Sequence, residues 1–337
     1  MKKKINIIAE VGVNHNGSLI IAKKLIDTAK KSGADYVKFQ TFKAENLVRK
    51  NTKIKGYQKK NIKKKITQFE LLQKLQLTSE DHKVLIKYCK KKKIKFLSSP
   101  FDIESCKLLI KLGLKEFKIP SGELDNYPLL VLIGKTAKKV FLSTGMANIQ
   151  EIKNSKKILI KNGLNKKDLV ILHCNTDYPA NLNEVNLLAL NVIKKNFKTN
   201  YGFSDHTLGS EAAIASVALG ASIIEKHITL SKHLSGPDHS SSMEPSEFKK
   251  FVTSIRNCEK LLGYEKKIPS NSEKKNMFTV RKSIVAKKNI RKGEFFSEVN
   301  LTCKRPFNGL SPFYWPLIIG KKAKKNYLKD ETIKIKI

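Results

Sequence analysis

Eight short apolar segments recur along the first 262 residues, and most are followed by a stretch with helical periodicity. Their apolar runs are continuous, as in ILHC and VFLS, which is typical of parallel strands buried on both faces. The helical stretches instead repeat apolar residues at intervals of three and four. We expect strands at residues 5–12, 36–40, 96–99, 117–120, 140–144, 170–174, 201–204 and 222–228, and helices that include 19–31, 129–134, 151–161, 187–195, 210–219 and 245–262.

Eight strand–helix units in about 260 residues predict an α/β fold, the (β/α)₈ TIM barrel. In this fold the functional side chains lie where strands end and the following loops begin. The segment after the second predicted strand, roughly residues 41–78, is long and very basic, and we expect a loop that serves as a substrate lid.

The sequence changes character after Leu262, where Gly, Pro and Ser mix with charged residues as in a linker. The strand-like pieces beyond it are too few to build a strong core alone. We therefore divide the chain into a catalytic barrel domain at residues 1–265, a linker at 266–280 and a small β-rich domain at 281–337.

The net charge of +38, from 67 Lys and Arg against 29 Asp and Glu, raises the question of nucleic-acid binding. Only five of the basic residues are arginines, the type preferred for bidentate recognition of bases and phosphates. The lysines are spread over the helical segments. We interpret them as a solvated surface that also attracts small anionic substrates, and expect no nucleic-acid partner.

The five cysteines are scattered and never in C-x-x-C spacing, which argues against disulfides and a zinc ribbon and favours the cytoplasm. The longest nearly apolar run, residues 212–224, is shorter than the roughly 20 residues that cross a bilayer. The N-terminus also lacks the apolar stretch and cleavage site of a secretion signal. We expect no membrane partner.

Polar side chains stand at the end of every predicted strand. A polar group in an apolar strand costs free energy unless something binds it, so eight such ends together predict one site. In chain order they are Glu10, Asn14 and His15; Lys38 and Gln40; Ser98 and Ser99; Lys118, Ser121 and Glu123; Ser143 and Thr144; His173, Asn175, Thr176, Asp177 and Tyr178; Ser204, Asp205 and His206; and Glu225 and His227.

Lys38 and Lys118, with the hydroxyls of the strand-end serines, suit a small phosphorylated anion because lysine offers a point charge to phosphate. No Walker motif or glycine-rich phosphate loop accompanies them. Two other roles stay open. Each lysine could form a salt bridge or snorkel, and Lys118 could form a Schiff base as in aldolases of this fold.

His206 and His227 end neighbouring predicted strands and can converge on one point. Neutral imidazole is the commonest metal ligand, and two imidazoles would suit a loosely held Mn²⁺ or Mg²⁺ with open positions for substrate. Glu225 and Asp205 could assist them. The alternative is that one or both histidines are hydrogen-bonded core residues.

The motifs AEVGVNHNG, VKFQTF, KIPSGE, LSTGM, GFSDHT, EKHITL, SGPDH and KRPxNG together resemble the sialic acid synthase family, in its order and over nearly the whole chain. The resemblance implies condensation of phosphoenolpyruvate with N-acetylmannosamine or a related acetamido sugar. It also implies a C-terminal antifreeze-like (SAF) domain, a divalent metal, usually Mn²⁺, and a domain-swapped homodimer.

The resemblance also implies roles for individual residues. The metal would be held by His206 and His227, with Glu225 close to its water, and Glu10 or Glu225 would move protons. Phosphoenolpyruvate would contact Lys38, Ser99, Lys118, Ser121, Ser143, Ser204 and either Asn175 or Thr176. The sugar would face Glu10, Gln40, Tyr178 and Asp238, and Arg305 would reach it from the other subunit. Ser99 stands where the family often has Thr.

Three alternatives remain at this point. Within the family, the sugar could be the diacetamido substrate 2,4-diacetamido-2,4,6-trideoxymannose, which leads to legionaminic acid. A neighbouring enzyme type makes 3-deoxy-octulosonate phosphate, but it generally lacks the C-terminal KRP module. A nucleic-acid-binding protein would leave the polar strand ends without a role.

Overall fold

The computed structural model describes residues 4–54 and 66–335. The chain divides into two compact units, Met1–Gly263 and Tyr264–Ile337. Within the first unit, eight strands form one sheet in the order β3-β2-β1-β8-β7-β6-β5-β4, with parallel neighbours. The strands at the two ends of this order, β3 and β4, also contact each other, which closes the sheet into the predicted barrel.

All eight predicted strands are confirmed, with ends that differ by no more than one residue. They are β1 (Asn6–Gly12), β2 (Tyr36–Thr41), β3 (Lys95–Pro100), β4 (Glu116–Ile119), β5 (Lys139–Ser143), β6 (Leu169–His173), β7 (Asn200–Asp205) and β8 (Ile223–His227).

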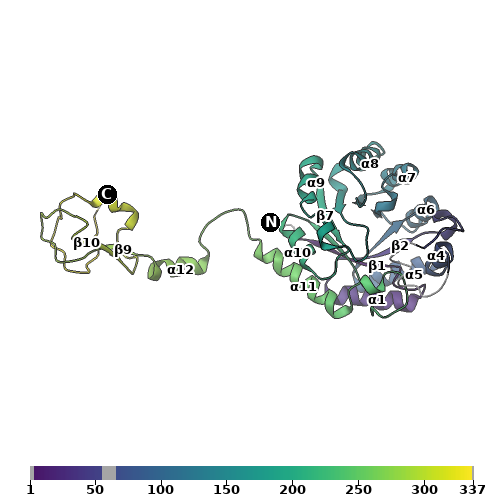
Figure 1. Cartoon of the computed structure of the whole chain (residues 1–337), viewed down its shortest axis with the longest axis horizontal. Coiled ribbons are helices and arrows are strands. Elements are labelled where there is room, and N and C mark those ends of the chain that lie inside the picture. The colour runs from purple at the N-terminus through teal and green to yellow at the C-terminus, as the bar shows by residue number, and fades with distance from the viewer. Residues whose placement is uncertain (1–3, 55–65, 336–337) are drawn as a thin grey trace. The chain divides into compact units, whose positions relative to one another are not determined.

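Helices surround the strands as an outer ring (Figure 1). They are α1 (Leu19–Ser32), α2 (Ala44–Leu47), α4 (Gln68–Leu75), α5 (Ser79–Lys92), α6 (Ile103–Lys111), α7 (Tyr127–Thr136), α8 (Ile149–Lys161), α9 (Ala189–Phe197), α10 (Glu211–Ala218) and α11 (Pro245–Leu261). Their ends follow from local chemistry. In α1, for example, the Ser18 side chain accepts from the Ile21 amide, and Gly33 ends the helix in the left-handed conformation.

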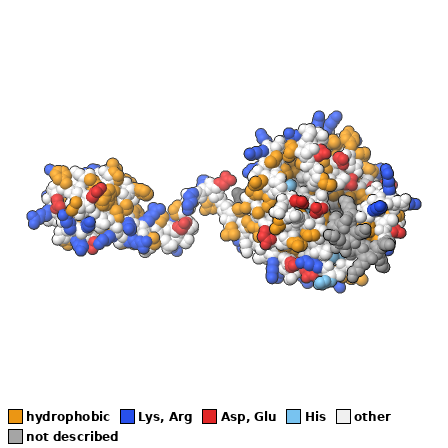
Figure 2. Space-filling model, viewed as in Figure 1, with side chains coloured by type: hydrophobic (Ala, Val, Ile, Leu, Met, Phe, Trp, Pro, Cys, Tyr) orange, Lys and Arg blue, Asp and Glu red, His pale blue; other side chains and the backbone are white. Residues whose placement is uncertain are grey.

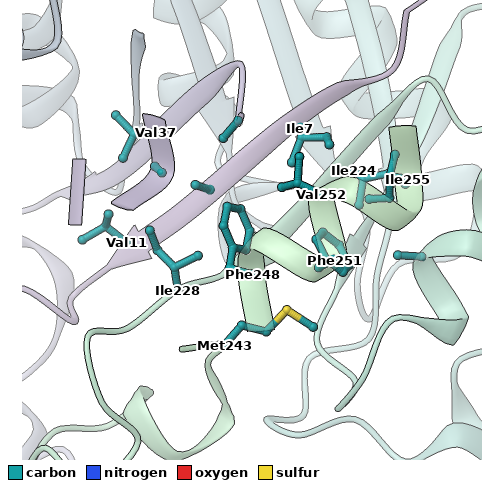
Figure 3. Packing of buried hydrophobic residues seen from close by; sticks show 14 of the residues in the cluster. Ile7, Val11, Val37, Ile224, Ile228, Met243, Phe248, Phe251, Val252 and Ile255 are labelled. Carbon is teal, nitrogen blue, oxygen red and sulfur yellow. The ribbon is translucent and has the colours of Figure 1, made fainter. Parts of the chain in front are cut away.

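The main core lies between the strands and these helices. Figure 3 shows one part of it, where Phe248, Phe251 and Val252 of α11 pack near Ile7 of β1 and Ile224 of β8. In the strands, core side chains such as Ile7 and Ile224 alternate with side chains that point into the barrel. The outer core therefore fixes the strand register on which the interior depends.

The expectation of a plain loop at residues 41–78 is wrong for its described part, because α2 and α4 form there. The Thr67 side chain and Glu70 form a capping box that starts α4. Leu71 and Leu75 of α4 then pack against Val13. Residues 55–65 of this expected lid lie outside the described residues.

The second unit contains a small antiparallel pair, β9 (Ser283–Ala286) with β10 (Leu301–Lys304), and the helices α12 (Asn271–Val280) and α13 (Trp315–Ile318). Its own core includes Ile284, Leu301 and Tyr327. The predicted linker at 266–280 thus contains a helix, because Ser270 and Glu273 form a capping box at the start of α12.

Lysine and arginine side chains are distributed over the visible face of each unit (Figure 2). Within residues 4–54 and 66–335, no helix combines the length and apolar character required to cross a membrane.

Candidate active site

An apolar plug fills the barrel interior beneath the site. It consists of Ile8, Tyr36, Leu97, Phe141, Val170, Leu172 and Ile223. Because side chains alternate along a strand, the residue two positions further on also points inward. The plug is therefore followed by polar residues: Glu10 after Ile8, Lys38 after Tyr36, Ser99 after Leu97, Ser143 after Phe141, and Glu225 after Ile223.

A cavity of about 390 Å³ opens beside these polar side chains. Its lining brings together all the candidate site residues except Asn175 and Arg305: Glu10, Lys38, Gln40, Ser99, Lys118, Ser121, Ser143, Thr176, Tyr178, Ser204, His206, Glu225, His227 and Asp238. The side chain of Asn175 instead bonds the Glu184 carbonyl. Arg305 is exposed in the second unit.

The two lysines lie in a buried network with two carboxylates. Lys38 Nζ is 2.9 Å from Glu10 Oε1 and 3.7 Å from Glu225 Oε1, and Lys118 Nζ is 3.0 Å from Glu225 Oε1. Ser204 donates to the same Glu225 oxygen at 2.8 Å. In the structure both lysines thus make the salt bridges that the sequence leaves open as an alternative.

Burial and the neighbouring charges shift the pKa values of this network in different directions. Burial is the larger effect for Lys118, whose pKa is lowered, and for Glu10, whose pKa is raised. Burial opposes the charge of Lys38, but Glu10 and Glu225 outweigh it and raise the pKa of Lys38. Burial likewise opposes the carboxylate of Glu225, yet Lys118 and Lys38 bring the pKa of Glu225 to about 2. Oε2 of Glu10, Oε2 of Glu225 and the hydroxyl of Ser143 are buried and have no hydrogen-bond partner among the residues that the structure describes. A site with such atoms is suited to a ligand that supplies their partners.

His206 and His227 face each other with ring centroids 5.8 Å apart. His206 Nδ1 is 2.5 Å from the Asn175 carbonyl oxygen, so this nitrogen must donate. Burial lowers the pKa of His206 to about 3 and that of His227 well below its usual value, so both rings are neutral. Nε2 of His206 then carries a lone pair, which accepts from the Tyr178 hydroxyl at 3.0 Å.

This donor set fits a loosely held divalent cation. Two neutral imidazoles converge, and the Asn175 carbonyl fixes the tautomer of His206, as carbonyls do behind metal-bound histidines. The Nδ1 atom of His227 is buried without a partner. Among the described residues, no group of three or more His, Cys, Asp or Glu side chains is placed to hold a metal.

Asp205 does not assist the histidines as expected. Its Oδ2 pairs with Lys226 Nζ at 2.8 Å, and its Oδ1 accepts from the amide and hydroxyl of Thr207. Asp205 faces away from the barrel interior because it alternates with Ser204 and His206 along β7.

Several other strand-end residues have structural partners outside the cavity lining. Ser98 bonds Thr41, Thr144 donates to the Leu172 carbonyl, and His173 Nε2 donates to the Val185 carbonyl. Asn14 donates to the Ile228 carbonyl, and His15 Nδ1 accepts from the Gly17 amide. These groups stabilise the segments that carry the site.

One wall of the cavity was not predicted from the sequence. We call it the apolar wall, and it consists of Val13, Val48, Leu71, Leu72, Leu75 and Phe101. The available signal was the pattern T-x-x-E at residues 67–70, followed by leucines at helical spacing. Cys174 also lines the cavity, with its sulfur 3.2 Å from Ser121 Oγ.

Gly12 allows the strand end to carry the site. It has φ +55°, and a Cβ there would lie 3.2 Å from Glu10 Oε1 and 3.3 Å from His227 Cε1. The β1–β2 register also shifts between Glu10 and Gly12. A side chain at this position would therefore be strained and would press on both groups.

Known protein families match most of the chain. The NeuB family matches residues 25–267, and the SAF domain matches residues 281–336. An N,N'-diacetyllegionaminic acid synthase from Campylobacter jejuni is 53% identical over 98% of this chain and 99% of its own length. A protein of the same name from Legionella pneumophila is 42% identical over 97% of this chain and 92% of its length.

A solved structure gives the same fold. The N-acetylneuraminic acid (sialic acid) synthetase from Leptospira borgpetersenii superposes with a TM-score of 0.72. It is 32% identical and covers 82% of this chain and 91% of its own.

Proposed function

The chain belongs to the NeuB family, and we propose that it condenses phosphoenolpyruvate with an acetamido sugar to form a nonulosonic acid and release phosphate. The observation that carries the proposal is the single cavity in which two lysines, four serine hydroxyls and two neutral histidines converge above the apolar plug. Relatives over nearly the full length are named as synthases of such acids.

The anion would lie deep in the barrel. Lys38, Ser99, Lys118, Ser121, Ser143 and Ser204 would hold the phosphate and carboxylate of phosphoenolpyruvate. Glu10 and Glu225 hold the two lysine side chains in position before the substrate arrives. Thr176 lines the cavity whereas Asn175 does not, which favours Thr176 as the remaining contact.

His206 and His227 would hold a divalent cation, Mn²⁺ or Mg²⁺. When bound, such an ion supplies Lewis-acid polarisation of the sugar's carbonyl oxygen. Glu10, Gln40, Tyr178 and Asp238 would orient the sugar so that C3 of phosphoenolpyruvate faces its carbonyl carbon. As C3 bonds to the carbonyl carbon, C2 becomes electron-poor, a water molecule adds to C2, and the C–O bond to phosphate breaks. Either Glu10 or Glu225, whose Oε2 atoms have no partner among the described residues, would take the proton of that water or give one to the sugar's carbonyl oxygen. Lys118 stays bonded to the anion throughout and forms no covalent intermediate.

The favoured product is N,N'-diacetyllegionaminic acid. Two relatives with this name are 53% and 42% identical to the chain, whereas the sialic acid synthetase of known structure is 32% identical. We thus favour the diacetamido trideoxy sugar over N-acetylmannosamine. We also place the enzyme in the cytoplasm, where its five free thiols would stay reduced.

The function is tested by phosphate release from phosphoenolpyruvate with a panel of acetamido sugars, with and without Mn²⁺. Release that requires both an unphosphorylated acetamido sugar and the metal supports the proposal. Release with a phosphorylated aldose alone would instead indicate a 3-deoxy-octulosonate-phosphate type of enzyme.

A further inference from the structure

We infer that the apolar wall is a selectivity surface for the far end of the sugar, and that it favours a substrate whose terminal carbon is a methyl group over one with a terminal hydroxyl. The inference rests on the proposed function. It assigns sugar selection to a surface formed largely by α4 and the residue after α2, beyond the polar residues of the strands.

The apolar wall is built as part of a small packed cluster. Val13, Leu71 and Leu75 are buried and pack with Phe42, and Leu72 and Phe101 pack against them. Because the same side chains line the cavity, one face of α4 both anchors the helix and forms the wall.

Several contacts hold the wall in place. The Ala44 amide at the start of α2 donates to Gln76 Oε1, just after α4, at 3.2 Å. The Lys43 amide donates to Asp102 Oδ2 at 3.1 Å. A Cβ at Gly17 would lie only 2.6 Å from the Lys74 carbonyl oxygen, so the segment after β1 closely approaches the end of α4. The wall is therefore a fixed surface, which selectivity requires.

The wall lies nearer the cavity mouth than the anion site does. Lys38, Ser99, Lys118, Ser143 and Ser204 are strand residues, whereas the wall residues belong to the segments that follow β1, β2 and β3. Glu10 and Gln40, which would face the sugar, come from β1 and β2 on the same side of the barrel. A sugar whose carbonyl carbon meets phosphoenolpyruvate in the barrel would then direct its other end toward this wall.

The chemistry of the wall determines what it prefers. Its six side chains offer no hydrogen-bonding group, although Gln68 at the start of α4 also lines the cavity. A hydroxyl placed against the six apolar side chains, away from Gln68, would lose water without a replacement partner. A methyl group in the same place gains from leaving water. Apolar pockets discriminate by about 10- to 200-fold for one such group. We expect the 6-deoxy sugar to be preferred by about 10- to 100-fold in kcat/KM.

The test compares 2,4-diacetamido-2,4,6-trideoxymannose with its 6-hydroxy counterpart in the phosphate-release assay, using the full chain. Leu72→Gln places an amide in the wall, and Val48→Thr replaces a methyl by a hydroxyl with almost no change of shape. Leu132→Gln on α7 is the matched control, because Leu132 is also half-buried but lies outside the cavity lining.

We expect Leu72→Gln to reduce the preference for the 6-deoxy sugar by about tenfold, chiefly by slowing its use, while KM for phosphoenolpyruvate stays within about twofold. Val48→Thr should also reduce the preference for the 6-deoxy sugar. If Leu72→Gln does not fold, Val48→Thr alone tests the role of the apolar wall. Leu132→Gln should leave the preference unchanged.

Equal use of both sugars by the wild-type chain would overturn the inference and leave the proposed function standing. An unchanged preference in the folded wall variants would do the same. Absence of phosphate release with every acetamido sugar would overturn the proposed function, and this inference with it.

Discussion

Lys226 Nζ lies 2.8 Å from Asp205 Oδ2, and both side chains are almost completely buried between β7 and β8. Lys226 also donates to the Thr207 carbonyl at 2.6 Å. The pair lies on the outer side of the strands, and each member precedes one of the facing histidines, His206 and His227. It therefore ties together the two strand ends that would hold the metal.

We expect Lys226→Met to destabilise the barrel by about 3–5 kcal/mol, because it leaves Asp205 buried without its counterion. Chemical unfolding followed by far-UV circular dichroism measures this. The single tryptophan, Trp315, lies in the second unit, so its fluorescence follows that unit separately. Lys232→Met is the control, since it breaks a partly exposed pair with Glu247 and should cost no more than about 1 kcal/mol. Equal effects of the two changes would mean that the buried pair has no special role.

The metal should depend on both facing histidines. His206→Ala or His227→Ala should fold normally, weaken Mn²⁺ binding in calorimetry and reduce turnover by at least ~100-fold. His173→Ala is the matched control, because His173 bonds the Val185 carbonyl outside the cavity and should retain both properties. Normal Mn²⁺ binding and activity in either variant, after chelation and replenishment, would remove the metal assignment.

Lys118 should bind the anion without becoming covalently attached to substrate. Burial lowers the pKa of Lys118, as it does for Schiff-base lysines. However, its Nζ donates to Glu225 and lies in a cavity with hydroxyls suited to phosphate. Borohydride treatment with phosphoenolpyruvate should yield no adduct by mass spectrometry, and Lys118→Met should raise KM for phosphoenolpyruvate. A stable adduct on Lys118 would overturn the mechanism.

Asp238 should make stability fall as pH rises. Burial, with a smaller contribution from Glu10, raises the pKa of Asp238 to about 7, well above its value of about 4 in an unfolded chain. Between pH 4 and pH 7 the folded protein binds the proton of Asp238 more tightly than the unfolded chain does. In this range each unit of rising pH therefore lowers the free energy of unfolding by as much as about 1.4 kcal/mol.

Asp238→Asn removes this dependence. The free energy of unfolding of the variant, relative to the wild type, should therefore increase from pH 4 to pH 7 and then level off. A flat difference for Asp238→Asn would show that this carboxyl is not perturbed in the folded protein.

The strands and most of the candidate site could be predicted from the sequence because both depend on local patterns. Continuous apolar runs fix the strands, and the alternation that places Ile8 in the plug also places Glu10 in the cavity. The pairing of side chains from different strands is another matter. That Lys38 meets Glu10, and Lys118 meets Glu225, depends on distances between side chains from different strands, which no spacing in the sequence encodes.

The apolar wall was missed for a related reason. Its residues lie on segments between strands, where a charged and irregular composition favours a loop. The capping pattern at Thr67 and Glu70 does indicate a helix there, but only the packing of Leu71 and Leu75 on Val13 brings it to the cavity. The misassignment of Asp205 is a matter of orientation, since one position along a strand reverses the direction of the side chain.

Arg305 should complete the site of the other subunit in a domain-swapped homodimer. It is an exposed residue of the second unit and one of only five arginines in a chain with 67 basic residues. A planar guanidinium can hydrogen-bond an acetamido oxygen in a way that lysine cannot. Arg305→Lys should therefore weaken use of the sugar more than use of phosphoenolpyruvate.

Mixed dimers test the exchange itself. If the units are exchanged, a dimer of one Arg305→Ala chain and one His206→Ala chain has one site with both lesions and one with neither. It should recover about half of the wild-type activity. A dimer of a wild-type chain and a chain with both changes is the reciprocal control. It should be inactive, because each of its sites then carries one lesion. Activity in the control dimer, with none in the first, would mean that each second unit serves its own barrel.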